Sequence, residues 1–152
     1  YVLKLAEQLK KENVCILVAG YYDKTIHIPS NMVMLGRLDN QDTLAQYYSM
    51  ANLTILTSKR ETFSMVVAES LCCGTPVVGF QAGGPESIAL PEYSEFVEQG
   101  DIVALKKAVL HMLSQKIERK EVAKSAENVY SGERMVREYV RIYEELVEEK
   151  NG

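Results

Sequence analysis

A short turn near the middle of the chain, residues 62–64, leads into an apolar helix that begins near Ser64. The first N–H groups of such a helix, near Ser64, Met65 and Val66, have no partner within the helix and carry the positive end of its dipole. A helix start of this kind can bind a phosphate group. The side chains of Thr62 and Ser64 are small enough to let a ligand approach, and their hydroxyls can donate hydrogen bonds.

Two carboxylates flank this turn: Glu61 precedes it, and Glu69 lies eight positions later in the helix. Carboxylates accept hydrogen bonds from hydroxyl groups, so two of them on either side of a bound diphosphate could hold a sugar at each end. That pattern suits a nucleotide sugar, with one glutamate for the ribose and one for the second sugar. The spacing alone also allows a plainer interpretation, in which Glu61 caps a turn and Glu69 is a solvated helix residue.

The turn lies between two predicted strands, at residues 53–57 and 75–80. Gly74 suits the left-handed position after the helix, and Pro76 follows shortly. A strand, a turn, a helix and a second strand in this order place the turn at the C-terminal edge of a parallel sheet, where open α/β folds bind ligands. A glycine-rich loop, residues 81–86, follows at the same edge.

Hydrophobic patterns predict the rest of the fold. The unalternating apolar run at 14–19, closed by Gly20, predicts a parallel strand that is buried on both faces. Strands that alternate with helices predict a doubly wound α/β fold with a mainly parallel sheet and right-handed crossovers. The other predicted elements are short strands at 32–35 and 95–98 and helices at about 2–9, 118–130 and 133–150. A helix at about 41–51 follows the N-cap candidates Asp39 and Asn40, and another helix opens at the cap residue Asp101.

The composition limits the classes of function. The chain has 152 residues, 47% of them hydrophobic, and a net charge of −4, which predicts one ordinary globular domain. No cluster of Lys or Arg suggests nucleic acid as a partner. The three cysteines and two histidines are not spaced as metal ligands, so no metal is expected. No apolar run approaches the about 18–20 residues of a membrane span. The chain opens directly on an amphipathic pattern, from which we expect a piece of a longer protein.

The stretch from Glu61 to Glu69, continuing through residues 70–78, resembles the Glu-x7-Glu region of retaining glycosyltransferases of group 1, family 4. The resemblance covers nearly all of the chain from Val14 onward. It implies the GT-B arrangement, in which two Rossmann-like domains face each other.

Three further motifs resemble that family in the same order. Residues 32–36 are similar to the strand and glycine before its base-binding loop, and residues 47–58 to its run of tyrosine, acidic residue, strand and serine, with Asn52 in the acidic position. Residues 83–86 resemble its Gly-Gly-x-x-Glu region, with the second glutamate missing or shifted.

The resemblance implies a role for each residue that matches a motif. Glu69 would bind the ribose hydroxyls of the donor nucleotide. Glu61, the catalytic residue, would contact hydroxyls of the donor sugar as a positioning group rather than as an established nucleophile. Backbone amides of residues 63–65 would hold the diphosphate or the sugar, and backbone groups around Arg37 and Leu38 would meet the base. The implied donor-binding residues are Gly20, Arg37, Leu38, Thr62, Phe63, Ser64, Met65 and Glu69.

The chain also departs from the family. Thr62 and Ser64 stand where the family often has glycine, which leaves the donor sugar open. The family's Arg and Lys on the first strand and loop of this domain have no match, although Lys59 and Arg60 are near the turn. The resemblance therefore implies a single nucleotide-sugar-binding domain, the C-terminal half of a larger enzyme. We predict that this chain alone does not transfer sugar, and that the helix at 133–150 contacts the missing N-terminal domain.

For the larger enzyme, the resemblance implies retaining transfer of a hexose from a UDP- or GDP-sugar to a glycan or lipid-linked glycan, in surface or capsular polysaccharide assembly. Such an enzyme would use no metal or cofactor and would work in the cytoplasm, with peripheral contact at the inner face of the membrane. Two alternatives remain open. One is an α/β binding or regulatory module without turnover. The other is a nucleotide-sugar epimerase of GT-B shape, which needs carboxylates and a histidine in a pattern that this sequence does not show.

Overall fold

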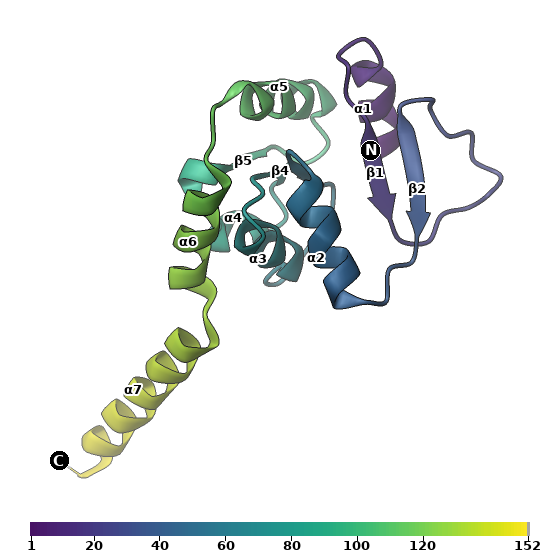
Figure 1. The fold of residues 1–152 in the computed structure, drawn as a ribbon. Coiled ribbons are helices and arrows are strands. Elements are labelled where there is room, and N and C mark those ends of the chain that lie inside the picture. Colours follow the sequence, from purple (N-terminus) through teal and green to yellow (C-terminus); the bar gives the residue numbers. More distant parts are fainter. Residues whose placement is uncertain (152) are drawn as a thin grey trace.

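A computed structural model describes residues 1–151 of the chain and the side chains of residues 1–148 (Figure 1). Short strands alternate with helices over most of this range, so the predicted α/β class is confirmed. The strands are β1 (Ile16–Ala19), β2 (Met32–Gly36), β3 (Thr54–Leu56), β4 (Val77–Phe80) and β5 (Ser94–Val97). The helices are α1 (Val2–Leu9), α2 (Gln41–Met50), α3 (Met65–Cys72), α4 (Pro85–Ile88), α5 (Ile102–Ser114), α6 (Arg119–Tyr130) and α7 (Gly132–Asn151), with a 3₁₀ turn at Pro91–Tyr93.

The described strands form two parallel sheets. Strand β1 pairs with β2, and β4 lies between β3 and β5. Ile16 lies opposite Met32 in the first sheet, and Val78 lies opposite both Ile55 and Glu95 in the second. The parallel pairing agrees with the sequence prediction, although the strands divide between two sheets. Because neighbouring strands are parallel, their C-terminal ends meet at one edge of each sheet.

The three-stranded sheet is covered on both faces. All four residues of β4 are buried, and their side chains alternate between the two faces. Val77 packs on one face with residues of α3 and α6, whereas Val78 and Phe80 pack on the other with residues of α1 and α5. The helix residues in these two layers are Val67, Leu71, Val122 and Ala126 on the first face, and Leu5, Leu9, Leu105 and Val109 on the second.

Strand β1 is covered on one face only. Ile16 and Met32 join the core beneath α1, but Leu17 and Val33, which point to the other face, are 37% and 46% exposed. The prediction that residues 14–19 are buried on both faces is therefore wrong. An apolar run indicates that both faces of a strand can be buried, but it does not reveal whether other elements pack against the second face. In the described chain, such packing is missing from the outer face of β1 and β2.

The helix ends follow their predicted signals. Asn40 and Asp101 cap α2 and α5, each accepting a hydrogen bond of 2.9 Å from the N–H group three residues later. Gly74 follows α3 with a φ of +77°. A Cβ at Gly74 would lie 2.6 Å from the carbonyl oxygen of Arg119, so the missing side chain also lets α6 begin directly against the end of α3.

The last helix, α7, extends away from the two sheets (Figure 1). Its apolar side chains, which the sequence pattern places on one stripe, are between 44% and 61% exposed. They are Met135, Val136, Tyr139, Val140, Ile142, Tyr143, Leu146 and Val147. The described part of the chain thus leaves this stripe uncovered. None of the described helices is long and apolar enough to cross a membrane.

Candidate functional site

Helix α3 begins at a residue with a strained backbone, Ser64. Its φ of +76° lies in the left-handed region that residues with side chains rarely adopt. The residue is only 7% exposed, and its hydroxyl oxygen has no hydrogen-bond partner in the described structure. Strain of this kind costs about 1–3 kcal/mol and is concentrated at functional sites. The strained backbone of Ser64 therefore makes the start of α3 a candidate ligand-binding site.

The backbone around Ser64 offers hydrogen-bond donors. The N–H groups of Met65 and Val66, the first two residues of α3, donate to no carbonyl group within residues 1–151. They are the unpaired donors that every helix start has, and they carry partial positive charge. The start of α3 thus combines free N–H groups with a buried hydroxyl that has no partner.

The turn before α3 is held against the glycine-rich loop after β4. The N–H of Glu61 donates to the carbonyl of Ala82 at 3.0 Å, and the N–H of Gly84 donates to the carbonyl of Glu61 at 2.9 Å. A Cβ at Gly84 would lie 2.4 Å from the carbonyl oxygen of Thr62, so only glycine allows this approach. These contacts fix the backbone of Glu61 on both sides.

These two loops line a hollow of about 650 Å³. Its lining residues are Arg60, Glu61, Thr62, Ser64, Met65 and Ala82. The hollow therefore brings together a helix start, a guanidinium group and a carboxylate. The first two favour an anion such as phosphate, and the carboxylate favours hydroxyl groups. Four of the predicted site residues, at positions 61, 62, 64 and 65, meet here.

Glu86 holds the glycine-rich loop in shape. Its carboxylate accepts hydrogen bonds from the N–H groups of Ala82 and Gly83 at 2.9 and 2.8 Å. Desolvation alone would raise the pKa of Glu86, but the bonds from Ala82, from its own N–H and from Gly83 outweigh it and keep the pKa below the usual value. Glu86 therefore shapes the loop with both carboxylate oxygens, which leaves it poorly placed to bind a ligand itself.

Glu69 does not line the hollow. It lies more than one turn further along α3, half-buried, where its Oε2 accepts a hydrogen bond of 3.3 Å from the hydroxyl of Tyr48 on α2. Desolvation raises the pKa of Tyr48 well above its usual value, and the charge of Glu69 adds to this effect. The phenol therefore stays protonated and remains a donor to Glu69.

The predicted base-binding residues Arg37 and Leu38 follow β2, and Gly20, a predicted donor-binding residue, follows β1. The N–H of Gly20 donates to the carbonyl of Gly36 at 2.7 Å, which joins the two strand ends. The Arg37 guanidinium pairs with Asp39 and donates to the hydroxyl of Tyr21 at 3.3 Å. These exposed groups do not line the hollow beside α3, so the predicted site residues fall into two clusters.

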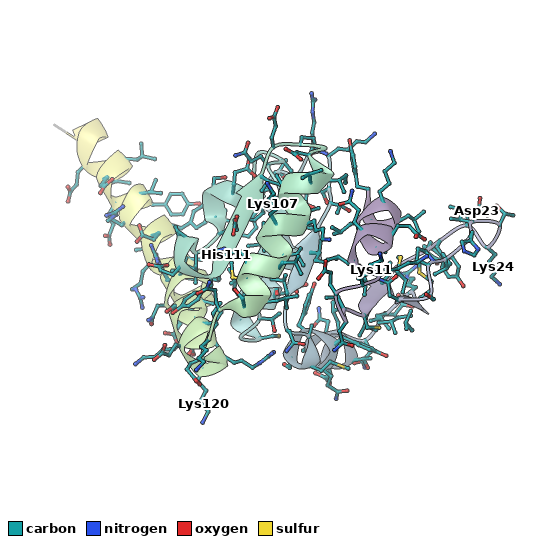
Figure 2. All side chains as sticks on the ribbon, turned by 90° about the horizontal axis from the view of Figure 1, so that it is seen from above. Lys11, Asp23, Lys24, Lys107, His111 and Lys120 are labelled. Atoms are coloured by element: carbon teal, nitrogen blue, oxygen red, sulfur yellow. The ribbon has the colours of Figure 1, made fainter. Side chains whose placement is uncertain are left out.

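Leu38 follows Arg37 and is half-buried in the loop before α2. Phe63 is 47% exposed and is not among the lining residues of the hollow. Figure 2 shows that the loop between β1 and β2 carries Asp23 and Lys24 to its outer tip, away from the sheets.

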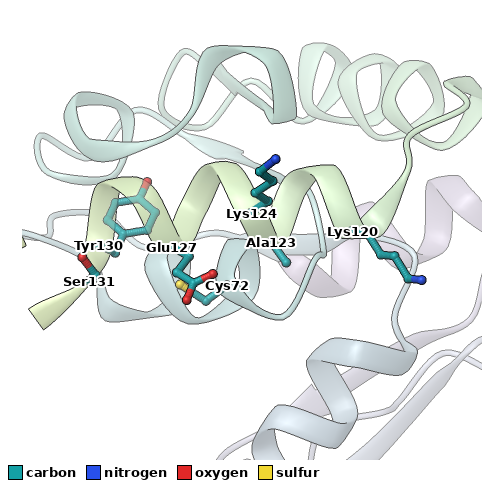
Figure 3. A pocket seen from close by; sticks show the side chains of 7 residues that line it. All are labelled: Cys72, Lys120, Ala123, Lys124, Glu127, Tyr130 and Ser131. Atoms are coloured by element: carbon teal, nitrogen blue, oxygen red, sulfur yellow. The ribbon is translucent and has the colours of Figure 1, made fainter.

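A second hollow, of about 470 Å³, lies along α6 near the C-terminal end of α3 (Figure 3). It shares no lining residue with the first hollow, at the start of α3. It is lined by Cys72, Lys120, Ala123, Lys124, Glu127, Tyr130 and Ser131. Desolvation raises the pKa of the Cys72 thiol, and Cys73 and Glu127 add to the effect. A protonated thiol is a poor nucleophile, so Cys72 is not activated for nucleophilic chemistry.

The structure adds residues that the sequence analysis did not place in the site. Arg60 and Ala82 line the hollow beside α3, and Tyr48 contacts Glu69. The signal for Arg60 was its position directly before Glu61, whereas Ala82 and Tyr48 become visible only through loop and helix packing. Among the described residues, no three side chains of His, Cys, Asp or Glu are grouped as metal ligands could be.

Comparison with known proteins gives a family match. The model of the family described as glycosyl transferases group 1 matches residues 1–129. Among curated proteins, the N-acetyl-alpha-D-glucosaminyl L-malate synthase of Bacillus anthracis is 30% identical over 135 residues, which cover 85% of this chain and 35% of that relative. The chain thus spans about a third of the length of this relative.

Solved structures share the fold. Sucrose-phosphate synthase from Thermosynechococcus elongatus superposes with a TM-score of 0.77 at 22% identity, covering 95% of this chain and 41% of that one. The Anabaena protein HepE, solved in complex with UDP, gives a TM-score of 0.68 at 17% identity, covering 95% of this chain and 44% of that one. At these identities the likeness shows the fold alone, which is the Rossmann-like α/β fold of GT-B glycosyltransferases.

Proposed function

Because the chain belongs to the group 1 glycosyl transferases, we propose that it binds the nucleoside-diphosphate-sugar donor of a glycosyl transfer reaction. The observation that carries this proposal is the unpartnered hydroxyl of Ser64, which is buried at the strained start of α3 and lines a hollow. A buried polar group without a partner costs about 1–3 kcal/mol, so a ligand that supplies the partner is favoured.

The diphosphate is assigned to the start of α3. Donors at or beside this hollow include the unpaired N–H groups of Met65 and Val66, the hydroxyls of Thr62 and Ser64, and the Arg60 guanidinium. Phosphate oxygens accept hydrogen bonds from all three kinds of donor. As the bond to the diphosphate breaks, negative charge develops on the leaving group, and fixed donors in this position would stabilise it.

The two glutamates are assigned to the two sugars of the donor. Glu61 shares the hollow with the diphosphate donors and has a fixed backbone, so its carboxylate is suited to orient the transferred sugar. Glu69 is assigned to the ribose hydroxyls, which the family resemblance supports. The base is assigned to backbone groups near Gly20, Arg37 and Leu38, at the ends of β1 and β2. Phe63 and Thr62 would border the sugar.

For the complete enzyme, we propose retaining transfer of a hexose to a glycan or lipid-linked glycan in polysaccharide assembly. This rests on the family resemblance, and the reaction would need neither a metal nor a cofactor. The exposed apolar stripe of α7 would cover part of the acceptor-binding domain of that enzyme. The enzyme would work in the cytoplasm, with peripheral contact at the inner face of the membrane, and residues 1–152 alone would not transfer sugar.

A second acceptor class has its own support. The Bacillus anthracis relative is named as a synthase of N-acetyl-alpha-D-glucosaminyl L-malate. Because this relative is 30% identical over most of the chain, UDP-N-acetylglucosamine is a candidate donor and a small hydroxy acid a candidate acceptor. Titration with UDP-N-acetylglucosamine and UDP-glucose would show which sugar the hollow prefers.

Isothermal titration calorimetry of the chain with UDP and GDP tests the donor-binding proposal. We expect one of the two to bind, Glu69→Ala to weaken that binding about tenfold, and Ser64→Ala to weaken it by a similar factor, since each variant removes a hydrogen bond to the ligand. Ser64→Ala should have little effect on uridine or guanosine, which lack the diphosphate.

Ser49→Ala is the matched control, because Ser49 is an exposed serine of α2 outside both clusters. It should leave the affinity unchanged. If neither UDP nor GDP binds at millimolar concentration, the chain is not a donor-binding domain, and the alternative of a binding or regulatory module without turnover gains support.

A further inference from the structure

Glu69 is the proposed ribose-binding group, and its carboxylate makes one side-chain hydrogen bond within residues 1–148. The Tyr48 hydroxyl donates to Oε2 at 3.3 Å, while Oε1 accepts no hydrogen bond there. A glutamate on a helix surface has several rotamers, and one hydrogen bond to a neighbouring helix can select among them. Tyr48 thus has the geometry to fix the direction in which the second carboxylate oxygen points.

Tyr48 can hold Glu69 only if its own helix is held. Thr75, which is fully buried at the start of the segment leading into β4, donates from its hydroxyl to the carbonyl of Tyr48 at 2.6 Å. Arg119, at the start of α6, donates to the carbonyl of Ala51 at 2.7 Å, to that of Tyr48 at 3.3 Å and to the Thr75 hydroxyl at 2.6 Å. The last carbonyls of α2 are thereby capped by a cation, which complements the negative end of the helix.

The same network reaches α3, the helix that carries Glu69. The hydroxyl of Ser70, the residue after Glu69, donates to the carbonyl of Thr75 at 2.9 Å. Its oxygen lies 2.7 Å from the hydroxyl of Thr54, which is free to donate to it. Ser70 and Thr75 are both fully buried. One polar cluster thus ties the end of α2 and the middle of α3 to the same point, which sets the distance between Tyr48 and Glu69.

We propose that Tyr48 is the positioning residue for Glu69: its hydroxyl holds one carboxylate oxygen so that the other is presented to the ribose hydroxyls, and Thr75 and Arg119 keep Tyr48 in place. This inference rests on the proposed donor-binding function. It assigns to α2 and α6, which supply no residue to the hollow beside α3, a part in recognising the nucleotide. Tyr48 acts through Glu69 and contacts no ligand itself.

The protonation state of the pair agrees with this role. Desolvation is the main cause that raises the pKa of Tyr48, and the negative charge of Glu69 raises it further. The phenol thus keeps its proton at neutral pH and remains able to donate to the carboxylate.

The experiment compares Tyr48→Phe with the unsubstituted chain, using calorimetry with UDP and GDP and with their 2′,3′-dideoxy analogues. The phenylalanine keeps the packed ring and removes only the hydroxyl. We expect the affinity for the ribose form to fall about three- to tenfold, as for the loss of one hydrogen bond, and the affinity for the dideoxy form to stay the same. Tyr47→Phe is the matched control, because Tyr47 is a half-buried neighbour on α2 whose hydroxyl makes no hydrogen bond in the described chain.

The outcomes separate the two proposals. If Tyr48→Phe weakens ribose and dideoxy forms equally, Tyr48 has a structural role only and the positioning inference is wrong. The inference is also wrong if Tyr48→Phe changes neither affinity while Glu69→Ala lowers that of the ribose form. If the unsubstituted chain binds neither diphosphate, the donor-binding proposal fails and the positioning inference fails with it.

Discussion

The three-stranded sheet and the two-stranded sheet differ in how completely they are covered. Strand β4 is buried along its whole length between two helical layers, and the loops at its C-terminal end and that of β3 line the hollow beside α3. Strands β1 and β2 are covered on one face, and the groups at their C-terminal ends are exposed. The proposed diphosphate end of the site thus lies beside a strand that is covered on both faces, and the proposed base end lies beside strands that are covered on one face.

This contrast has a physical reason. Stabilising a phosphate group with fixed N–H donors requires that the donors do not move, because displaced dipoles lose their advantage over water. A base can be held by stacking and a few backbone contacts, which tolerate more motion. The difference in burial between the two sheets therefore fits two roles in the proposed site. The loops of the three-stranded sheet would orient the reacting end of the donor, and those of the two-stranded sheet would contribute affinity for the base.

The largest expected effect tests the difference in cover directly. Phe80→Ala, in β4, should lower the free energy of unfolding by about 3–5 kcal/mol, because the ring is fully buried and packs edge-on against Tyr1 at 5.0 Å. Leu17→Ala, in β1, should cost less than about 1 kcal/mol, since Leu17 is 37% exposed. Urea unfolding followed by circular dichroism measures both. If Phe80→Ala leaves too little folded protein to measure, Phe80→Leu supplies a smaller step. Equal losses for the two sheets would contradict the contrast.

The second-largest expected effect is steric and concerns Gly84. Gly84→Ala places a Cβ 2.4 Å from the carbonyl oxygen of Thr62, so the two loops beside α3 must separate. We expect a loss of stability of about 1–3 kcal/mol and a loss of UDP or GDP affinity of more than about tenfold. Gly36→Ala, at the end of β2, meets no atom within 4 Å and strains only its own φ of +74°. It should cost about 1–2 kcal/mol of stability with a smaller change in affinity. Unchanged affinity in Gly84→Ala would show that the hollow does not bind the diphosphate.

The smallest expected effect concerns pH. The folded-state pKa of Glu86 lies below the usual value of 4.5, so its hydrogen bonds stabilise the glycine-rich loop fully above pH 4.5 and are lost as the pH falls through the lowered value. Glu86 is exposed, which limits the effect to roughly a few tenths of a kcal/mol. The difference in melting temperature between the chain and Glu86→Gln should therefore be small at pH 7 and shrink further as the pH falls below 4.5. A difference that grows as the pH falls would have the wrong sign.

Much of this architecture could be predicted from the sequence because its signals are local. The caps Asn40 and Asp101, the glycine after α3 and the apolar runs of the strands identify elements without reference to the rest of the fold. The placing of Glu61, Thr62, Ser64 and Met65 around one hollow also followed from local order, since a turn between a parallel strand and a helix can open only at one edge.

What the sequence did not reveal depends on contacts between distant segments. The open face of β1 reflects a missing layer, and no pattern within residues 14–19 encodes it. The positive φ of Ser64 has no marker in a residue type that usually avoids it. The contact of Tyr48 with Glu69 spans 21 positions, and the hydrogen bonds that Thr75 and Arg119 donate to the carbonyl of Tyr48 span 27 and 71.

The strained backbone at Ser64 affects which residues are favoured at this position as the sequence evolves. Glycine at position 64 would adopt the positive φ without strain. Selection for stability alone would therefore favour glycine over serine there. A chain that keeps serine there retains a buried hydroxyl at the expense of folding free energy, and it can do so only while the well-covered β4 region supplies enough stability to spare. The serine at position 64 therefore depends on the stability of the buried core as well as on the hollow that it lines.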